Sequence, residues 1–185
     1  PAGRERPDCD LACLDAMERV FEDNAGKVAA LVIEPLMQGA AGIRIYPPEV
    51  LRGAAEIARR HGALVIADEV AVGLGRTGHL FACELAGVEP DLLAVAKGLS
   101  GGYLPLAATL ATEEIYEAFK GEHTQYRTFF HGHSYTGNPL ACAAAVASLR
   151  LVQEEGFLPR VREAAAHFAA RLEPLWGLPH VGDVR

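Results

Sequence analysis

Residues 64–97 read LVIADEVAVGLGRTGHLFACELAGVEPDLLAVAK and contain two short apolar runs, each followed by a charged side chain. The first run ends at Asp68 and the second ends at Lys97. Short apolar runs between turn signals are typical of strands that are buried on both faces of a parallel sheet. Because ligands bind at the carboxyl ends of such strands, we expect Asp68 and Lys97 to face one small molecule from two sides.

The same pattern continues on both sides of this stretch. Apolar runs at 28–33, which ends at Glu34, and at 106–110 predict two further strands. Helical periodicity and capping residues predict helices over 8–23, 48–61, 139–155 and 159–175. The alternation of strands and helices predicts an α/β protein with a mostly parallel sheet flanked by helices.

The last two predicted helices each carry an apolar stripe. In the first of them the stripe consists of Leu140, Ala144, Ala147 and Leu151, and in the second of Val161, Ala165, Phe168 and Leu172. Stripes with this spacing usually face the core.

The amino-acid composition argues against several classes of function. The 185 residues carry a net charge of −7, so no basic face is expected for nucleic acid or for an anionic membrane. No apolar run approaches the roughly 20 residues that span a bilayer, and residues 1–10 do not resemble a signal peptide. We expect a cytoplasmic protein that acts on small molecules.

The cysteines and the chain ends add two expectations. Cys9, Cys13, Cys83 and Cys142 lack zinc-site spacing and lie among aliphatic residues, which favours reduced thiols that serve as small core residues. The chain starts at Pro1 without Met and stops at Val184-Arg185, where a further strand is predicted to begin, so we expect a piece of a longer protein.

The sequence offers two alternatives to a shared Asp68–Lys97 site. Gly73, Gly75 and Gly78 spell the G-x-G-x-x-G of dinucleotide-binding folds. That fingerprint turns directly from strand into helix, whereas here two carboxylates occupy the strand end and would repel a pyrophosphate. A metal site at His131 and His133 with Asp68 and Glu69 lacks further ligands at suitable spacing.

Asp68 and Lys97 together suit pyridoxal phosphate, although each alone is an ordinary strand-end residue. A lysine amine binds the cofactor aldehyde covalently when partial burial and a cationic ring lower its pKa. A carboxylate keeps the pyridine nitrogen protonated, so the ring remains an electron sink. Gly98, Gly101 and Gly102 follow the lysine and are expected to leave space beside it. Transamination is the predicted chemistry.

At these residues the sequence resembles the class III pyridoxal-phosphate aminotransferases over nearly its whole length. The matching motifs occur in one order: VIEP (32–35), IADEV (66–70), GLGRTG (73–78), PDL leading to AKG (90–98), and GNPLA (137–141). The resemblance implies the fold-type I large domain with bound pyridoxal 5′-phosphate.

The resemblance also implies residue roles. Lys97 would carry the cofactor and Asp68 would pair with its ring nitrogen, with Val70 on the ring face and Glu34 in the surroundings of Asp68. Gly132, His133 and Ser134 align with a family loop that crosses a homodimer to the partner's cofactor phosphate; an ordinary solvated loop is the alternative.

Within the class, the sequence looks most like the branch that converts 8-amino-7-oxononanoate to 7,8-diaminononanoate in biotin biosynthesis. Ala71 stands where many members have Gln, and Ala40 stands where many have an acidic residue. The amino donor would be S-adenosylmethionine or lysine. Alternatives are a class III enzyme of the ornithine, acetylornithine or 4-aminobutyrate type, or a non-catalytic remnant of the fold.

The expected domain organisation follows from the same resemblance. Residues 1–157 would form the central part of the cofactor-binding large domain, and residues 158–185 a helix leading towards a small domain. The family's phosphate cup, its ring-stacking aromatic residue and its substrate-binding Arg are not identifiable in the sequence. We therefore expect this piece alone to be inactive.

Overall fold

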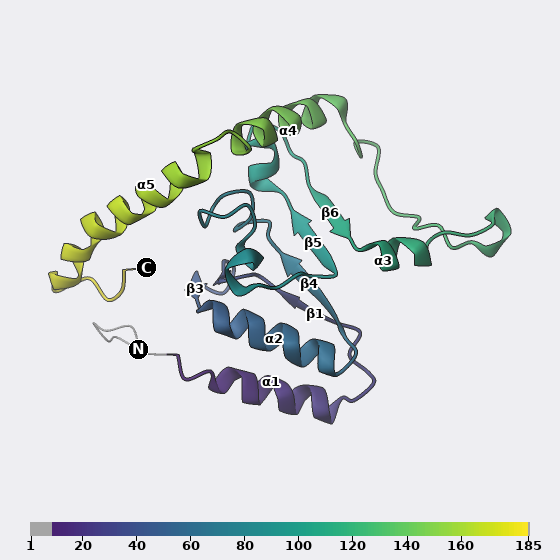
Figure 1. Cartoon of the computed structure of the whole chain (residues 1–185), viewed down its shortest axis with the longest axis horizontal. Coiled ribbons are helices and arrows are strands. Elements are labelled where there is room, and N and C mark those ends of the chain that lie inside the picture. The colour runs from purple at the N-terminus through teal and green to yellow at the C-terminus, as the bar shows by residue number, and fades with distance from the viewer. Residues whose placement is uncertain (1–8, 185) are drawn as a thin grey trace.

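A four-stranded sheet lies at the centre of the computed structural model, which describes residues 9–184 (Figure 1). Its strands are β1 (Ala30–Ile33), β4 (Leu64–Asp68), β5 (Leu92–Val95) and β6 (Ala108–Ala111), in the spatial order β1-β4-β5-β6. The first three run parallel and β6 is antiparallel to β5. The sequence prediction of a mostly parallel sheet is therefore confirmed.

The loop after β1 forms a second, two-stranded antiparallel sheet. It consists of β2 (Met37–Gln38) and β3 (Arg44–Ile45). The sequence did not predict this sheet, because two-residue strands are too short to produce a hydrophobic period.

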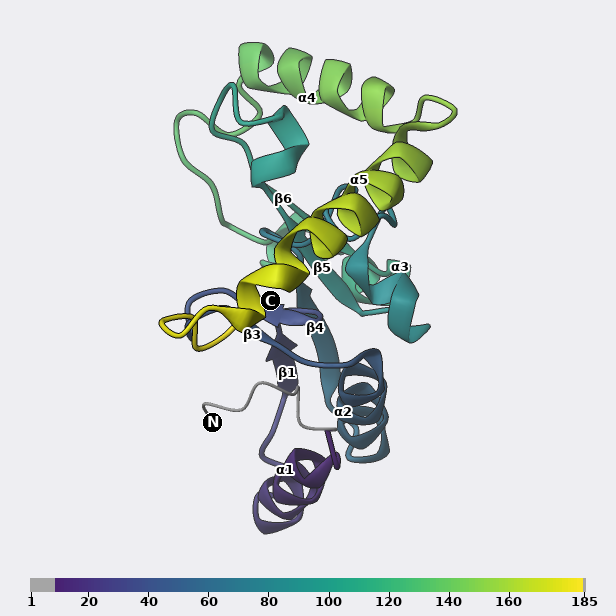
Figure 2. The same cartoon turned by 90° about the vertical axis from the view of Figure 1, so that its left-hand side faces the viewer.

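Helices α1 (Ala12–Asp23) and α2 (Pro48–Arg60) form two successive layers on one side of the sheet (Figures 1 and 2). Helix α2 packs on β1 and β4, and α1 packs on α2. Leu51, Ala54 and Ala58 recur at helical spacing on α2 and are buried. Val65 and Ala67 alternate on β4 and are fully buried, so the core lies between this helix and the sheet.

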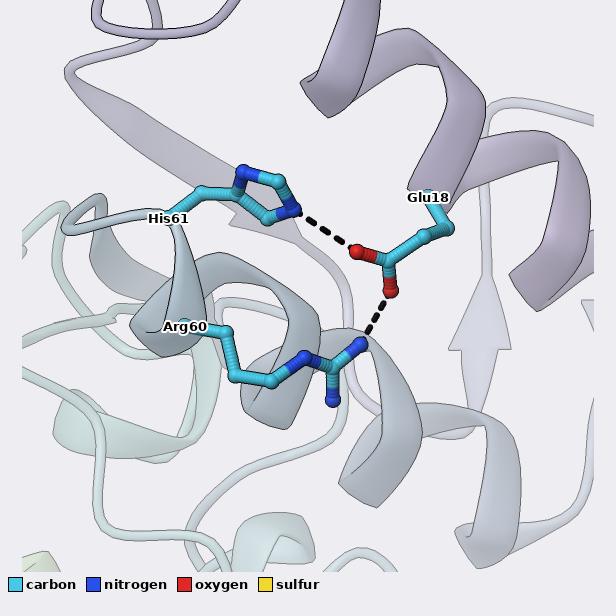
Figure 3. Close-up of polar contacts among 3 residues, drawn as sticks. All are labelled: Glu18, Arg60 and His61. Atoms are coloured by element: carbon cyan, nitrogen blue, oxygen red, sulfur yellow. Dashed lines mark hydrogen bonds and ion pairs between the residues drawn. The ribbon is translucent and has the colours of Figure 1, made fainter.

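A polar contact fastens α1 to α2 (Figure 3). The Glu18 carboxylate of α1 accepts hydrogen bonds from the Arg60 guanidinium and from His61 Nε2, the latter at 2.7 Å. The hydrogen bond from His61 is the main reason why the pKa of Glu18 lies below its ordinary value, and Arg60 adds to the effect. The His61 ring also lies 5.3 Å from the ring of Phe21.

The remaining helices are α3 (Glu113–Ala118), α4 (Pro139–Val152) and α5 (Phe157–Leu172). Helix α4 begins at Asn138, whose Oδ1 accepts hydrogen bonds from the backbone N–H groups of Leu140 and Ala141. Short 3-10 helices complete the fold: η1 (Ala82–Ala86), η2 (Lys97–Ser100), η3 (His123–Gln125) and η4 (Glu173–Gly177).

The predicted apolar stripes of α4 and α5 do not face the core. On α4 the buried residues are Ala141, Ala145 and Val152, whereas Leu140 and Leu151 are 70% and 56% exposed. Helix α5 has no buried residue among those described. Two apolar faces compete on α4, and the small side chains are buried because they allow the helix to approach η2 closely.

The cysteine prediction is only partly correct. All four thiols are free, but only Cys83 lies in the core; Cys9 and Cys13 are exposed and Cys142 is half-buried. Burial and the nearby Glu69 carboxylate raise the pKa of the Cys83 thiol. Between residues 9 and 184 no helix has the length and apolarity needed to cross a membrane.

Candidate active site

The carboxyl ends of β1, β4 and β5 meet at one edge of the sheet, as parallel pairing requires. Ile33 pairs with Ala67, and Asp68 pairs with Ala94. Glu34 therefore follows β1 beside the end of β4, and Lys97 follows the end of β5. The structure brings these three predicted site residues to the same edge.

Asp68 is half-buried and is held by one oxygen only. Its Oδ1 accepts a hydrogen bond of 3.0 Å from the backbone N–H of Val70. No other hydrogen bond or ion pair reaches this carboxylate from the described part of the chain. The second oxygen is thus oriented and available to a ligand.

Lys97 opens the 3-10 helix η2 and its side chain is exposed. The sequence argument required partial burial of this amine, and residues 9–184 do not supply it. Lys97 makes no ion pair with Asp68 or with any other described carboxylate. Its backbone is fixed, because its carbonyl accepts the Gly102 N–H at 3.2 Å.

The glycines after Lys97 serve close packing and turning. A Cβ at Gly98 would lie 3.2 Å from Leu74 Cβ, so Leu74 fills the space that the sequence left open. The Gly98 carbonyl accepts a hydrogen bond of 3.0 Å from Ser148 Oγ of α4. Gly101 and Gly102 have positive φ values of 62° and 80°, which glycine adopts without strain.

Glu34 forms its hydrogen bonds within the loop that follows β1. Its Oε2 accepts the backbone N–H of Gly39 at 3.0 Å, and its carbonyl accepts the Tyr46 hydroxyl. Burial raises the pKa of that hydroxyl. The carboxylate is therefore bound to Gly39, while its strand position keeps it beside Asp68.

The glycine loop between the two strands supports a helix. A Cβ at Gly75 would lie 3.1 Å from the Phe157 ring, and one at Gly78 would lie 2.5 Å from Arg162 Cγ. Arg162 Nη1 also donates to the Gly78 carbonyl at 2.6 Å. The G-x-G-x-x-G pattern thus accommodates side chains of α5, which agrees with its rejection as a nucleotide fingerprint.

Glu69 is a possible metal ligand from the sequence, and its burial was not predicted. The side chain is 1% exposed, and its two oxygens accept the backbone N–H groups of Ala82 and Cys83, both at 2.8 Å. The signal was the alternation along β4, because Glu69 continues the buried face of Val65 and Ala67.

The predicted phosphate-contacting residues Gly132, His133 and Ser134 lie in an exposed loop before α4. The His133 N–H donates to Thr136 Oγ1 at 3.0 Å, and the Tyr135 N–H donates to His133 Nδ1 at 3.1 Å. The chain from α3 to α4 extends away from the sheet (Figure 1). Across residues 9–184, no three His, Cys, Asp or Glu side chains are grouped to hold a metal ion.

An apolar groove of about 500 Å³ lies between η2 and α4, next to the segment that follows Lys97. Tyr103 and Leu104 line one side, and Ala144, Ala147 and Leu151 line the other. Neither Asp68 nor Lys97 lines it, so the groove is separate from the charged strand ends.

The chain is similar to known proteins over nearly its whole length. The family model described as aminotransferase class-III matches residues 2–185. A relative from Nitratidesulfovibrio vulgaris, named adenosylmethionine-8-amino-7-oxononanoate aminotransferase, is 52% identical over 185 residues, which is 100% of this chain and 34% of the relative.

Solved structures of aminotransferases are also similar to this chain. The adenosylmethionine-8-amino-7-oxononanoate aminotransferase of Methanocaldococcus jannaschii is 40% identical with a TM-score of 0.88, over 100% of this chain and 42% of that one. An ornithine aminotransferase from Toxoplasma gondii is 34% identical with a TM-score of 0.81, over 93% and 38%. The chain thus spans well under half the length of these proteins.

Proposed function

The chain belongs to the class III aminotransferases and has the α/β fold of their fold-type I large domain, and we propose that its full enzyme uses pyridoxal 5′-phosphate to aminate 8-amino-7-oxononanoate. The product would be 7,8-diaminononanoate, an intermediate of biotin biosynthesis. The observation that carries the proposal is the pair of opposite charges, Asp68 and Lys97, which lie at adjacent parallel strand ends and form no ion pair within residues 9–184.

The residues of this edge fit the cofactor. Within residues 9–184, a carboxylate with one free oxygen and an amine without an ion pair lie at the ends of neighbouring strands, and they do not neutralise each other. A ligand that presents a cationic nitrogen to Asp68 and a carbonyl carbon to Lys97 would interact favourably with both side chains. Val70 and Glu34 lie beside Asp68 and complete the set of proposed cofactor contacts from this chain.

Bound pyridoxal phosphate supplies an aldehyde that takes up amino groups and a ring that withdraws electrons. The chain's own residues provide the proton chemistry. The free oxygen of Asp68 would hold a proton on the ring nitrogen, since a fixed carboxylate stabilises an adjacent cation. Lys97 Nζ would carry the cofactor and, once released, move a proton at the substrate's reacting carbon.

The substrate assignment is supported by the relatives. Proteins named for 8-amino-7-oxononanoate match this chain at 52% and 51% identity over its whole length. Their names include adenosylmethionine, so we propose S-adenosylmethionine as the amino donor, with lysine as the alternative. The similarity to an ornithine aminotransferase keeps an ornithine-type reaction as the second candidate.

We propose a homodimer in which Gly132, His133 and Ser134 reach the partner's cofactor phosphate. The loop is exposed, and exposed aromatic side chains accompany it, with Phe130 at 79% and Tyr135 at 74%. Apolar exposure on this scale is typical of interfaces. A full-length enzyme that sediments as a monomer would contradict the dimer.

The domain division is also a proposal. Residues 1–157 would belong to the large domain and 158–185 would lead towards the small domain. Gly156, with a φ of 87°, separates α4 from α5, and α5 buries no described residue. Both observations support a boundary near this glycine.

The test labels the lysine directly. Full-length enzyme with pyridoxal phosphate should show a visible absorption band, and borohydride reduction followed by peptide mapping should find the cofactor on Lys97. The variant Lys120→Ala, which changes an exposed lysine that follows α3, should keep the label. A label on any other lysine contradicts the site, and amino transfer from ornithine-type substrates without amination of 8-amino-7-oxononanoate contradicts the proposed substrate.

A further inference from the structure

Glu69 is a fully buried acid that the proposed chemistry does not use. It is one of two buried polar or charged residues described, and no cation lies within ion-pair distance of its carboxylate in the described chain. A buried carboxylate without hydrogen bonds would be strongly destabilising. Here the backbone N–H groups of Ala82 and Cys83 each bind one oxygen at 2.8 Å.

The backbone of Glu69 connects the same region to β5 and to the glycine loop. Its N–H donates to the Ala94 carbonyl at 2.9 Å, and its carbonyl accepts the Gly73 N–H at 2.9 Å. One residue thus links the strand that ends in Asp68, the strand that leads to Lys97, the loop between them and the start of η1.

The contacts continue from Glu69 to the lysine. A Cβ at Gly73 would lie 2.8 Å from the Glu69 carbonyl oxygen and 3.1 Å from Glu69 Oε2, so Gly73 rests directly on this side chain. The next residue, Leu74, has a φ of 55° and packs on Gly98, where a Cβ would meet Leu74 Cβ at 3.2 Å. Gly98 is the neighbour of Lys97, so a shift of the loop would displace the lysine backbone.

We propose that Glu69 is a positioning residue, whose carboxylate holds the 70–81 loop closed and thereby fixes Asp68 and Lys97 in their relative orientation. The inference rests on the proposed function of those two residues. The carboxylate suits this role because two acceptor oxygens match two N–H donors, whereas a carboxamide offers one acceptor and one NH₂ group. In Glu69→Gln the NH₂ group would face an N–H donor, and the loop would loosen on that side.

The experiment compares Glu69→Gln with two matched variants of the full-length enzyme. Glu84→Gln changes an exposed acid that caps the same 3-10 helix through the Phe81 N–H at 2.9 Å. Val65→Ala removes buried volume from the same strand and leaves the Glu69 carboxylate in place. For each variant, the thermal midpoint, kcat and KM, and the pH midpoint of the absorption band of the bound cofactor are measured.

Glu69→Gln is expected to lower kcat by about 100-fold, the scale of loss caused by a displacement of ~1 Å in a reacting group. The pH midpoint of the band should move by about half a unit or more, since the charges around a titrating group set its pKa. Glu84→Gln should retain the wild-type kcat and midpoint, and Val65→Ala should lose thermal stability only. A Glu69→Gln enzyme that behaves like Val65→Ala overturns the proposal.

Two further measurements test the proposal if the first variant does not fold or gives no clear change. If Glu69→Gln does not fold, Gly73→Ala displaces the same carboxylate from the other side and should give the same changes in band and kcat. Hydrogen exchange of the amides in 96–99 should quicken in Glu69→Gln but not in Glu84→Gln; unchanged exchange overturns the proposal. A wild-type enzyme without label on Lys97 would instead disprove the proposed function, while exchange would still report on the loop.

Discussion

Asp68 lies at the end of β4, and one oxygen of its carboxylate is held in a fixed position. Its Oδ1 is fixed by the Val70 N–H, and this local turn needs no other partner. The sequence predicted that the residue lies at the sheet edge, since the apolar run stops there. It could not predict that the chain itself occupies one carboxylate oxygen, because this depends on the turn that follows the strand.

Replacement of Asp68 with Ala should slow turnover without removing the cofactor. Loss of one preorganised electrostatic partner typically lowers kcat by about 10²–10³-fold, while Lys97 is untouched and should still take up the label. Turnover and borohydride labelling of the full-length variant measure the two effects. Asp23→Ala, at the exposed end of α1, is the control. Wild-type turnover in Asp68→Ala would remove this residue from the mechanism.

At the scale of elements, the sequence predicted most of the fold. The apolar runs located β1, β4 and β5, and Asn138 with Pro139 located the start of α4, because local period and capping determine these features. The buried faces of α4 and α5 could not be predicted in this way. Leu140 and Leu151 look like core residues, but small residues on the neighbouring face allow closer contact with η2.

The contact between α1 and α2 should give the stability a distinct dependence on pH. The pKa of Glu18 lies below its ordinary value of 4.5 in the folded state. Its contribution is therefore fully present above 4.5 and is lost as the pH falls through the lower folded value. Unfolding of wild type and Glu18→Gln by urea, measured on both sides of this pH, should show a difference that shrinks in acid.

Glu22→Gln on the same helix is the matched control, since Glu22 is exposed and its side chain forms no ion pair among the described residues. The Glu18 contact is partly exposed, so added salt should also reduce the difference. A difference between wild type and Glu18→Gln that stays constant with pH would contradict the assigned ion pair.

At the scale of the whole molecule, residues 9–184 bring only part of the proposed site together. Lys97 is exposed, and the loop containing Ser134 lies away from the edge that carries Asp68. The sequence could predict the charges at the strand ends, since these depend on neighbouring strands. Burial of the lysine could not be predicted, because it depends on packing between elements and not on the local pattern.

Subunit mixing tests the dimer. Full-length Lys97→Ala and Ser134→Asp should each be inactive, the second because a carboxylate repels the partner's phosphate. If Ser134 serves the partner's site, a mixed dimer contains one intact site, so random mixing should restore about a quarter of the wild-type activity. Mixing Lys97→Ala with Asp68→Ala should restore none, because both defects affect the subunit's own site. Equal results in the two mixtures would contradict the exchange.

Strand β6 has a practical consequence for work with this chain. It is the last strand of the described sheet, all four of its residues are exposed, and Leu110 is 49% exposed. An uncovered edge strand offers free N–H and C=O groups to any other extended chain. Expressed by itself, the polypeptide is therefore expected to aggregate through strand pairing, and charged substitutions at Leu110 would be the first means of keeping it in solution.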